Sequence, residues 1–257
     1  NLVYAGYMYS SGTGENKAGI YDTLTDEIRE IDVSSLEINF VSRCCIGEKY
    51  YYICYEDKDG KLFTARFDKK TGELVDNTPT DSEDSAYIIE CGEDDEGRFF
   101  AYMLNSSDGG NTTDSVVRCV YDDSMELVKS TDIFKKESVG SDSFFSTMTI
   151  SADESVYIFI ENSDGTTDMT KFSPDMEEMY TVQDVLSDMN GWFSQCMVLE
   201  NGNPIIATYD TENMNGEGNG RTNFNVIDAL SGEVVGRYDR NEFYGYINRR
   251  WISFRIY

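Results

Sequence analysis

The chain has 257 residues, of which 40% are hydrophobic and 13% aromatic, enough apolar surface to build a large folded domain. Its 48 acidic and 21 basic residues give a net charge of −27, which repels nucleic-acid phosphates and anionic lipid headgroups. We therefore expect no nucleic-acid partner, whereas cationic ligands, divalent ions and basic protein surfaces are electrostatically favoured. No stretch approaches the roughly 18 apolar residues that a membrane span requires, so no direct membrane insertion is expected either. The charge itself is sufficient to keep the protein soluble, and we expect a monomer.

The chain contains no histidine, which removes the commonest general base and metal ligand. Zinc hydrolysis and Ser-His-Asp chemistry are therefore excluded within this chain. The six cysteines include no C-x-x-C pair and lie in apolar runs, so we predict free, buried thiols, although an even number also permits three disulfides. The neighbouring pair Cys44 and Cys45 is expected to point to opposite faces of a strand. The cysteines are Cys44, Cys45, Cys54, Cys91, Cys119 and Cys196.

Strand patterns follow one another along the chain as short β-branched and aromatic runs, separated by Gly, Asn and Asp turns. The only helical pattern, at residues 182–189, is too short for more than a turn or two. In chain order the predicted strands are 2–10, 18–24, 38–46, the run EKYYYICY from Glu48, 86–91, the run GRFFAYML from Gly97, 145–150, the run ESVYIFIE from Glu154, 193–199, the run GNPIIATY from Gly202 and the C-terminal run FYGYINRRWISFRIY.

A motif recurs in which an aromatic or aliphatic residue and an Asp are followed by a short turn, a Glu and two apolar residues. It reads FDKKTGELV at 67–75, YDDSMELV at 121–128 and IDALSGEVV at 227–235, with weaker copies at 20–31 and 172–180. Its anchor residues are Asp22, Asp68, Asp122, Ser173 and Asp228, which are 46, 54, 51 and 55 residues apart. A period of this length that carries four strands is typical of a propeller blade, because one four-stranded sheet buries its faces only against neighbouring sheets.

We therefore predict an all-β fold, a β-propeller of four-stranded blades, with a β-sandwich as the alternative. Five blades are visible, and six to eight are expected if the chain is truncated. The blades are predicted at about 1–36, 37–82, 83–134, 143–185 and 191–240, with 241–257 as a closing strand or the start of the next blade. The first blade lacks its first strand. Both ends lie inside apolar runs, so we expect a single domain excised from a longer chain or from a mature secreted form.

The segments FDKKTGELV and IDALSGEVV resemble the strand-turn-strand of quinoprotein-like and surface-layer-type propeller repeats. The acidic, Tyr-rich strands are also similar to propeller segments of Gram-positive surface lipoproteins, some of which accompany the solute-binding domains of transporters. This resemblance implies a propeller and an extracellular or cell-surface location. It implies no cofactor, because no positions here match the cofactor-binding residues of the quinoprotein enzymes.

Two kinds of site rest on carboxylates. Asp57 and Asp59, followed by Gly60, begin like a calcium loop, but the next two residues break the pattern, so a solvated hairpin turn is the alternative. No cofactor is expected, and calcium is the one metal for which the sequence offers candidate ligands. Glu37 and Glu90 are the strand-borne acids that we expect to face inward, where a glycosidase would need two carboxylates about 5–9.5 Å apart.

Aromatic side chains offer stacking surfaces for a ligand, with core packing as the alternative. The candidate ligand-binding residues are Tyr50, Tyr52, Trp192, Tyr246 and Trp251. From these patterns we predict a non-catalytic extracellular module that binds a protein partner or a small solute such as a saccharide or peptide. A glycosidase-like enzyme that uses paired carboxylates and a structural spacer beside a solute-binding domain are the two alternatives.

Overall fold

A computed structural model describes most of the chain. The described residues are 3–10, 15–22, 25–80, 87–107, 112–139, 142–185, 192–199, 201–210 and 221–239. Within these ranges the chain is all-β, and its one helical element is the single 3₁₀ turn η1 (Lys136–Ser138). The helical pattern at 182–189 does not form a helix in its described part: Val182 ends a strand and residues 183–185 are irregular. In these same ranges no helix has the length and apolar content to cross a membrane.

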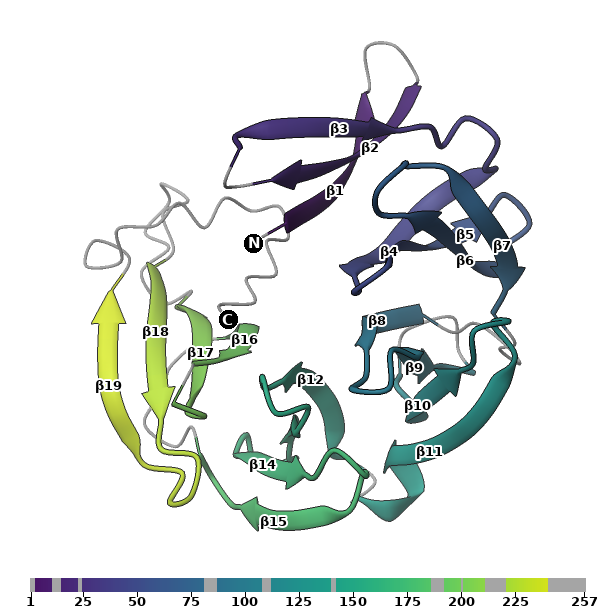
Figure 1. Cartoon of the computed structure of the whole chain (residues 1–257). Helices are drawn as coiled ribbons and strands as arrows, with labels where there is room; N and C mark the ends of the chain where they lie inside the picture. Colours follow the sequence, from purple (N-terminus) through teal and green to yellow (C-terminus); the bar gives the residue numbers. More distant parts are fainter. Residues whose placement is uncertain are drawn as a thin grey trace. The chain divides into compact units, whose positions relative to one another are not determined.

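Five antiparallel sheets follow one another along the chain (Figure 1). The first contains β1 (Val3–Ser10), β2 (Glu15–Asp22) and β3 (Glu27–Ile31). The second contains β4 (Ile38–Ile46), β5 (Tyr50–Asp57), β6 (Leu62–Asp68) and β7 (Leu74–Pro79). The third contains β8 (Tyr87–Glu93), β9 (Phe99–Asn105), β10 (Ser115–Tyr121) and β11 (Leu127–Lys135). The fourth contains β12 (Phe144–Ile150), β13 (Val156–Glu161), β14 (Thr167–Phe172) and β15 (Glu178–Val182). The fifth contains β16 (Trp192–Val198), β17 (Pro204–Asp210), β18 (Arg221–Ile227) and β19 (Val234–Asp239).

Within every sheet each strand pairs with the strand before it in the chain, which is the meander of a propeller blade. The predicted all-β fold of four-stranded blades is confirmed. Three strands of the first sheet lie in the described residues. The predicted closing strand at 241–257 lies outside them.

The chain divides into two compact units. The first, Asn1–Lys135, holds the first three sheets, and the second, Lys136–Tyr257, holds the last two. In the first unit the edge strand β4 approaches the edge strands β1 and β8. In the second unit β12 approaches β16 in the same way.

Strand β5 shows why the central strands are buried on both faces. Its residues Tyr51, Ile53 and Tyr55 pack in a cluster with the first sheet, whereas Tyr52 and Cys54 pack in a cluster with the third sheet. Successive side chains of a strand point to opposite faces, so each face of the second sheet meets a neighbouring sheet. Burying one such large side chain stabilises the folded state by about 1.5–3 kcal/mol. The run of three tyrosines is therefore explained by packing.

The Asp of the sequence repeat caps the hairpin between the third and fourth strands of a sheet. Asp68 Oδ1 accepts hydrogen bonds of 2.8 Å from the backbone N–H groups of Lys70 and Thr71. Gly72 then adopts a φ of 77°, which closes the turn in a region that favours glycine. The same cap recurs at Asp122, with Ser124 and Glu126 as donors, at Ser173, with Glu177, and at Asp228, with Leu230 and Ser231.

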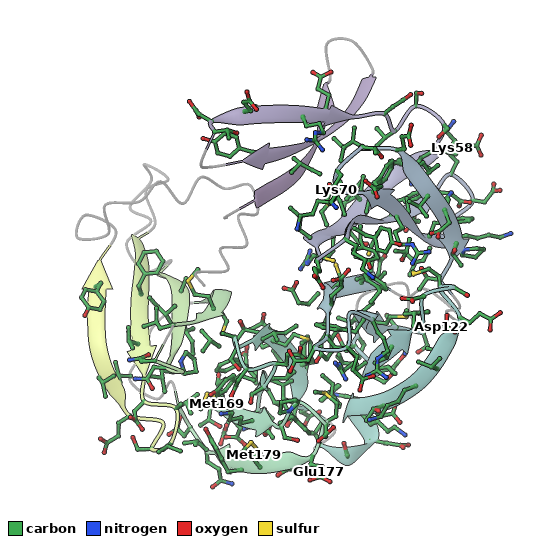
Figure 2. The ribbon with its side chains drawn as sticks, viewed as in Figure 1. Lys58, Lys70, Asp122, Met169, Glu177 and Met179 are labelled. Atoms are coloured by element: carbon green, nitrogen blue, oxygen red, sulfur yellow. The ribbon has the colours of Figure 1, made fainter. Side chains whose placement is uncertain are left out.

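The last strand of a sheet is more exposed than the strand before it. In the fourth sheet Met169 on β14 is fully buried, whereas Met179 on β15 faces solvent (Figure 2). Strands β3 and β7 are also mostly exposed. Burial is therefore concentrated in the second and third strands of each four-stranded sheet, and the last strands carry the polar surface.

Candidate functional site

The first strand of each four-stranded sheet contains a β-bulge near its beginning. In β4 a bulge lies at Ser42, because Val41 pairs with Tyr55 and Arg43 already pairs with Cys54, and a further register shift lies at Asn39. The equivalent bulged residues are Ile89 in β8, Ser146 in β12 and Ser194 in β16. A bulge fixes the register of a strand and turns its side chains. The four sheets can therefore be compared position by position at this end.

An aromatic residue stands two positions before each bulge. These residues, called here the first-strand aromatics, are Phe40, Tyr87, Phe144 and Trp192. Phe40 is 55% exposed, Tyr87 37% and Phe144 44%. For Trp192 the described part is its backbone at the start of β16. Single exposed apolar residues are common on proteins, but an exposed ring at the same register position of successive sheets suggests a binding surface.

Two of the first-strand aromatics have a carboxylate opposite them in the neighbouring strand. Phe40 pairs with Glu56, and Phe144 pairs with Glu161. Both glutamates are half-buried. Directly opposite residues lie about 4.5–5.5 Å apart at Cβ and share a face. Each unit thus places an exposed phenyl ring beside an acid.

In the first unit a side-chain bridge holds the bulge of β4 against that of β8. Arg43 donates a 2.5 Å hydrogen bond from Nε to the backbone oxygen of Ile89, and its Nη1 donates to the backbone oxygen of Ser42 at 2.8 Å. Phe40 and Tyr87 precede these bulges, so they stand at the same end of two neighbouring strands. Together with Glu56, they form the candidate binding site of the first unit.

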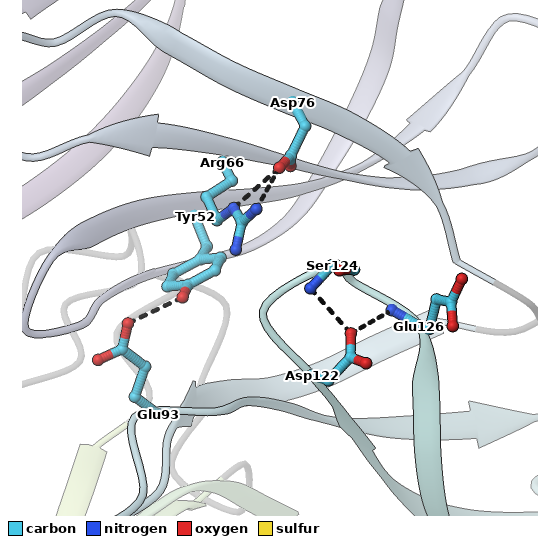
Figure 3. Close-up of polar contacts among 7 residues, drawn as sticks. All are labelled: Tyr52, Arg66, Asp76, Glu93, Asp122, Ser124 and Glu126. Atoms are coloured by element: carbon cyan, nitrogen blue, oxygen red, sulfur yellow. Dashed lines mark hydrogen bonds and ion pairs between the residues drawn. The ribbon is translucent and has the colours of Figure 1, made fainter.

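Tyr52, a predicted ligand-binding residue, lies in the core between the second and third sheets. Its ring stacks on Phe99 with centroids 4.6 Å apart, and its phenol donates a 2.8 Å hydrogen bond to Glu93 (Figure 3). Burial, reinforced by the hydrogen bond to Glu93, raises the pKa of the Tyr52 phenol. The position of Tyr52 therefore matches core packing, which was the alternative to ligand binding for the aromatic residues.

Tyr50, the other predicted tyrosine of β5, is half-buried and contacts a cation of its own sheet. The guanidinium of Arg66 lies 4.6 Å from the centroid of the Tyr50 ring. Arg66 also donates to Asp76 Oδ2, from Nε at 3.0 Å and from Nη2 (Figure 3). This ring therefore already has a cationic partner within the fold.

The remaining predicted ligand-binding residues are Trp192, Tyr246 and Trp251. Trp192 occupies the first position of β16, where it matches Phe40, Tyr87 and Phe144 in register. Tyr246 and Trp251 lie outside the described residues.

The predicted calcium residues belong to the hairpin between β5 and β6. Asp57 Oδ1 accepts hydrogen bonds of 2.9 Å from the backbone N–H groups of Asp59 and Lys61. This oxygen of the Asp57 carboxylate thus closes the turn. In the part of the chain that the structure describes, no group of three or more His, Cys, Asp or Glu side chains could hold a metal ion.

Glu37 and Glu90, the carboxylates of the enzyme alternative, lie at the first strands of the second and third sheets. Glu37 is an exposed residue just before β4, and half-buried Glu90 accepts a hydrogen bond from the N–H of Cys91.

The second unit contains an open cleft of about 430 Å³. It lies between residues 182–185, at the end of β15, and residues 231–234, in the turn before β19, with Arg237 at its side. Gly232 lets the two segments approach closely, because a Cβ there would lie 2.2 Å from Cγ1 of Val182. The lining mixes acidic, basic and aliphatic groups and contains no aromatic ring. The first-strand aromatics are therefore the stronger candidate for a binding site.

No known protein family matches the chain, and no curated protein matches it in sequence. Solved structures do resemble it. A protein of unknown function from Bacteroides caccae is 14% identical with a TM-score of 0.56, and the match covers 95% of this chain and 74% of that one. A prolyl endopeptidase is 13% identical with a TM-score of 0.55, and the match covers 91% of this chain and 35% of that one. An apocarotenoid oxygenase mutant from Synechocystis is 9% identical with a TM-score of 0.52, and the match covers 88% of this chain and 55% of that one.

The prolyl endopeptidase and the apocarotenoid oxygenase have β-propeller-like folds. The chain accordingly has the fold of a β-propeller-like protein. At such low identity the likeness extends to the fold alone.

Proposed function

We propose that this chain is a non-catalytic binding module that holds a basic segment of a partner protein on the exposed rings of Phe40 and Tyr87 in its first unit. The observation that carries the proposal is the exposure of Phe40, Tyr87 and Phe144 at one register position of successive sheets. A ring held exposed on a rigid strand binds a partner at little entropic cost, since its backbone is already ordered.

The neighbouring charges favour a cationic partner. Glu56 and Glu161 stand opposite Phe40 and Phe144, and the whole chain carries a net charge of −27. An ammonium or guanidinium group gains from both an aromatic face and a carboxylate, each contributing about 0.5–2 kcal/mol depending on burial. The overall field also attracts a basic surface and accelerates its association. A small saccharide gains from the aromatic face but not from this field.

The other parts of the proposal rest on the sequence resemblance. We propose an extracellular or cell-surface location, as in the surface-layer-type repeats and the surface lipoproteins that the strands resemble. In that setting the module would stand beside a solute-binding or other domain. A structural spacer would need no exposed aromatic residue at a repeated position of its sheets, and for this reason we favour the binding module over it.

The enzyme alternative has less support. The solved structures that resemble the chain include a luciferin-regenerating enzyme, a prolyl endopeptidase and an oxygenase, but at 8–13% identity they speak only to the fold. For a hydrolase that uses paired carboxylates, Glu37 and Glu90 remain the candidates, and neither sits in a described pocket. We therefore keep the non-catalytic function as the proposal.

The test is a direct binding measurement with defined probes. Fluorescein-labelled peptides rich in Lys and Arg, the same peptides with Glu in their place, and neutral oligosaccharides are titrated with the protein at low and high salt. We expect the basic peptides alone to bind, and their affinity to fall as salt increases. Phe40→Ala should weaken binding at least about tenfold, as loss of a central aromatic contact does.

A matched control separates this site from general surface chemistry. Ile28 on β3 is also exposed, at 71%, but it lies on an outer strand. Ile28→Ala should leave peptide affinity unchanged. Salt-independent binding of an oligosaccharide that Phe40→Ala abolishes would place a saccharide at the site and overturn the basic partner. Binding of the basic peptides that neither substitution changes would mean that the net charge alone attracts them.

A further inference from the structure

Three thiols from three strands meet in the core between the second and third sheets. Cys54 and Cys91 are buried in this cluster, and the half-buried Cys45 packs against it. Cys44, the neighbour of Cys45 in β4, packs in the cluster on the opposite face, as the alternation of a strand predicts. All of these cysteines are free.

The backbone brings Cys45 and Cys91 opposite each other. Arg43 on β4 donates a hydrogen bond to the backbone of Ile89 on β8, and two residues further along each strand stand Cys45 and Cys91. Side chains two positions apart on a strand point to the same face. Cys91 consequently interacts through its thiol with Cys45, and also with Cys54. A disulfide requires two cysteines on closely approaching segments, and here β4 approaches β8 while both thiols pack in the same cluster.

We propose that Cys45 and Cys91 form an oxidation site, in which a disulfide links the first strand of the second sheet to the first strand of the third. The oxidant is a low-molecular-weight disulfide such as oxidised glutathione. The half-buried Cys45 is the first to react because Cys91 and Cys54 are almost fully covered.

The reaction is a pair of thiol–disulfide exchanges. The Cys45 thiolate attacks one sulfur of oxidised glutathione, breaks its S–S bond and releases one molecule of reduced glutathione. The Cys91 thiolate then attacks Cys45 Sγ, breaks the mixed disulfide and releases the second. Two protein thiols are oxidised, the small disulfide is reduced to two thiols, and the two protons of the protein thiols end on the released glutathione.

The second exchange limits the rate. In the reduced protein the hydrogen bond with Cys45 and burial hold the pKa of Cys91 well above its ordinary value. Burial persists once Cys45 carries glutathione, so the Cys91 thiolate is still scarce at neutral pH. Oxidation is therefore slow at neutral pH and accelerates as the pH rises. A fully exposed thiol pair would react rapidly under the same conditions.

The experiment uses the whole chain with oxidised glutathione at mildly alkaline pH. Remaining thiols are blocked with iodoacetamide, and the protein is digested with trypsin. Cleavage after Arg43, Lys49, Lys58, Lys70 and Arg98 places Cys45, Cys54 and Cys91 in different peptides, 44–49, 50–58 and 71–98. We expect four of the six cysteines to be alkylated and peptide 44–49 to be linked to 71–98.

Cys44→Ser is the matched control, because it leaves Cys45 as the single cysteine of peptide 44–49. The linked peptide should form in this variant as in the natural sequence, and it should be lost in Cys45→Ser. The midpoint of denaturation should rise on oxidation and return when the disulfide is reduced. Alkylation of all six cysteines, glutathione that remains attached to Cys45, or a link between 50–58 and 71–98 would each overturn the proposal.

Discussion

Tyr52 on β5 and Glu93 at the end of β8 form a hydrogen bond of 2.8 Å that joins the second and third sheets. The other carboxylate oxygen of Glu93 accepts a 2.6 Å hydrogen bond from the N–H of Glu48 in the turn after β4. Gly47 makes room for the carboxylate, since a Cβ at that position would lie 1.8 Å from Glu93 Oε1. The Glu93 carboxylate of the third sheet is thus bound to the turn after β4 in the second sheet, and it fixes how these two sheets pack together.

Tyr52→Phe is expected to lower the free energy of unfolding by about 1–2 kcal/mol, because it removes a donor to a charged, partly buried acceptor while keeping the ring. Urea denaturation measures this loss. Tyr87→Phe removes the same atom from an exposed ring and should change stability by less than about 0.5 kcal/mol. Equal effects for the two variants would contradict an inter-sheet role for the Tyr52 phenol.

Asp76→Asn should cost about 1–3 kcal/mol, because it removes the partner of the mostly buried Arg66 guanidinium while Asp76 itself is partly exposed. The control is Asp132→Asn, which breaks the ion pair with Lys135 on the protein surface. That variant should lose less than about 0.5 kcal/mol. Both are read from urea midpoints at low salt, and a loss at Asp132 as large as that at Asp76 would rule out the explanation by burial.

Gly232→Ala should destabilise the second unit more than Gly165→Ala does. Both glycines have a positive φ, 73° and 82°, so both variants carry a conformational cost of about 1 kcal/mol. At Gly165 nothing lies within 4 Å of the added Cβ, whereas at Gly232 the Cβ would clash with Val182. Thermal denaturation of the two variants measures the difference, which should be zero if the segments 182–185 and 231–234 do not pack together.

Asp68→Asn should make stability less sensitive to acid. The backbone N–H groups of Thr71 and Lys70 lower the pKa of Asp68 below its ordinary value of 3.8. The ionised carboxylate therefore stabilises the fold above that value, and this stabilisation is lost as the pH falls through the lowered folded-state pKa. The gap in unfolding free energy between the natural sequence and the variant should narrow in acid.

Ser173→Ala provides the uncharged comparison for this pH effect. Ser173 caps the equivalent turn of the fourth sheet by accepting a 3.1 Å hydrogen bond from the N–H of Glu177. Its loss should destabilise the protein by the same amount at neutral and acidic pH. An acid-dependent effect at Ser173 matching that at Asp68 would mean that the charge of the cap is not the cause.

The sheets could be predicted from the sequence because their signals are local. The Asp of the repeat is a capping residue, and the cap forms within five or six residues of chain, so its recurrence marked one turn per sheet. The alternation of Cys44 and Cys45 between two clusters was predictable for the same reason.

The candidate site was largely missed because exposure depends on which strands lie at the edge of a sheet. Tyr50 and Tyr52 were predicted to bind a ligand because they belong to an aromatic run. However, β5 is the second strand of its sheet, and both of its faces pack against other sheets. Phe40 lies in the predicted strand 38–46, where the strand pattern alone does not indicate that its ring is exposed. Trp192, which was predicted, proves to share its register position.

A weak signal for the first-strand aromatics exists in the sequence. The triplet aromatic, apolar, Ser recurs as Phe40-Val41-Ser42, Phe144-Phe145-Ser146 and Trp192-Phe193-Ser194, and once more as Trp251-Ile252-Ser253. The serine of the first three is the bulged residue, so the triplet marks the beginning of a first strand. The last copy lies outside the described residues, within the segment predicted to close the first blade or to begin the next.

The measurement that tests the proposed binding site most directly is oxidative footprinting of the protein with and without a bound Lys- and Arg-rich peptide. Hydroxyl radicals label exposed rings, and mass spectrometry reports the labelling of each residue. We predict that the labelling of Phe40 and Tyr87 falls several-fold in the complex, while exposed Ile28 and Leu230 on other strands and turns keep theirs. Unchanged labelling of Phe40 and Tyr87 in a saturated complex would contradict the proposed site.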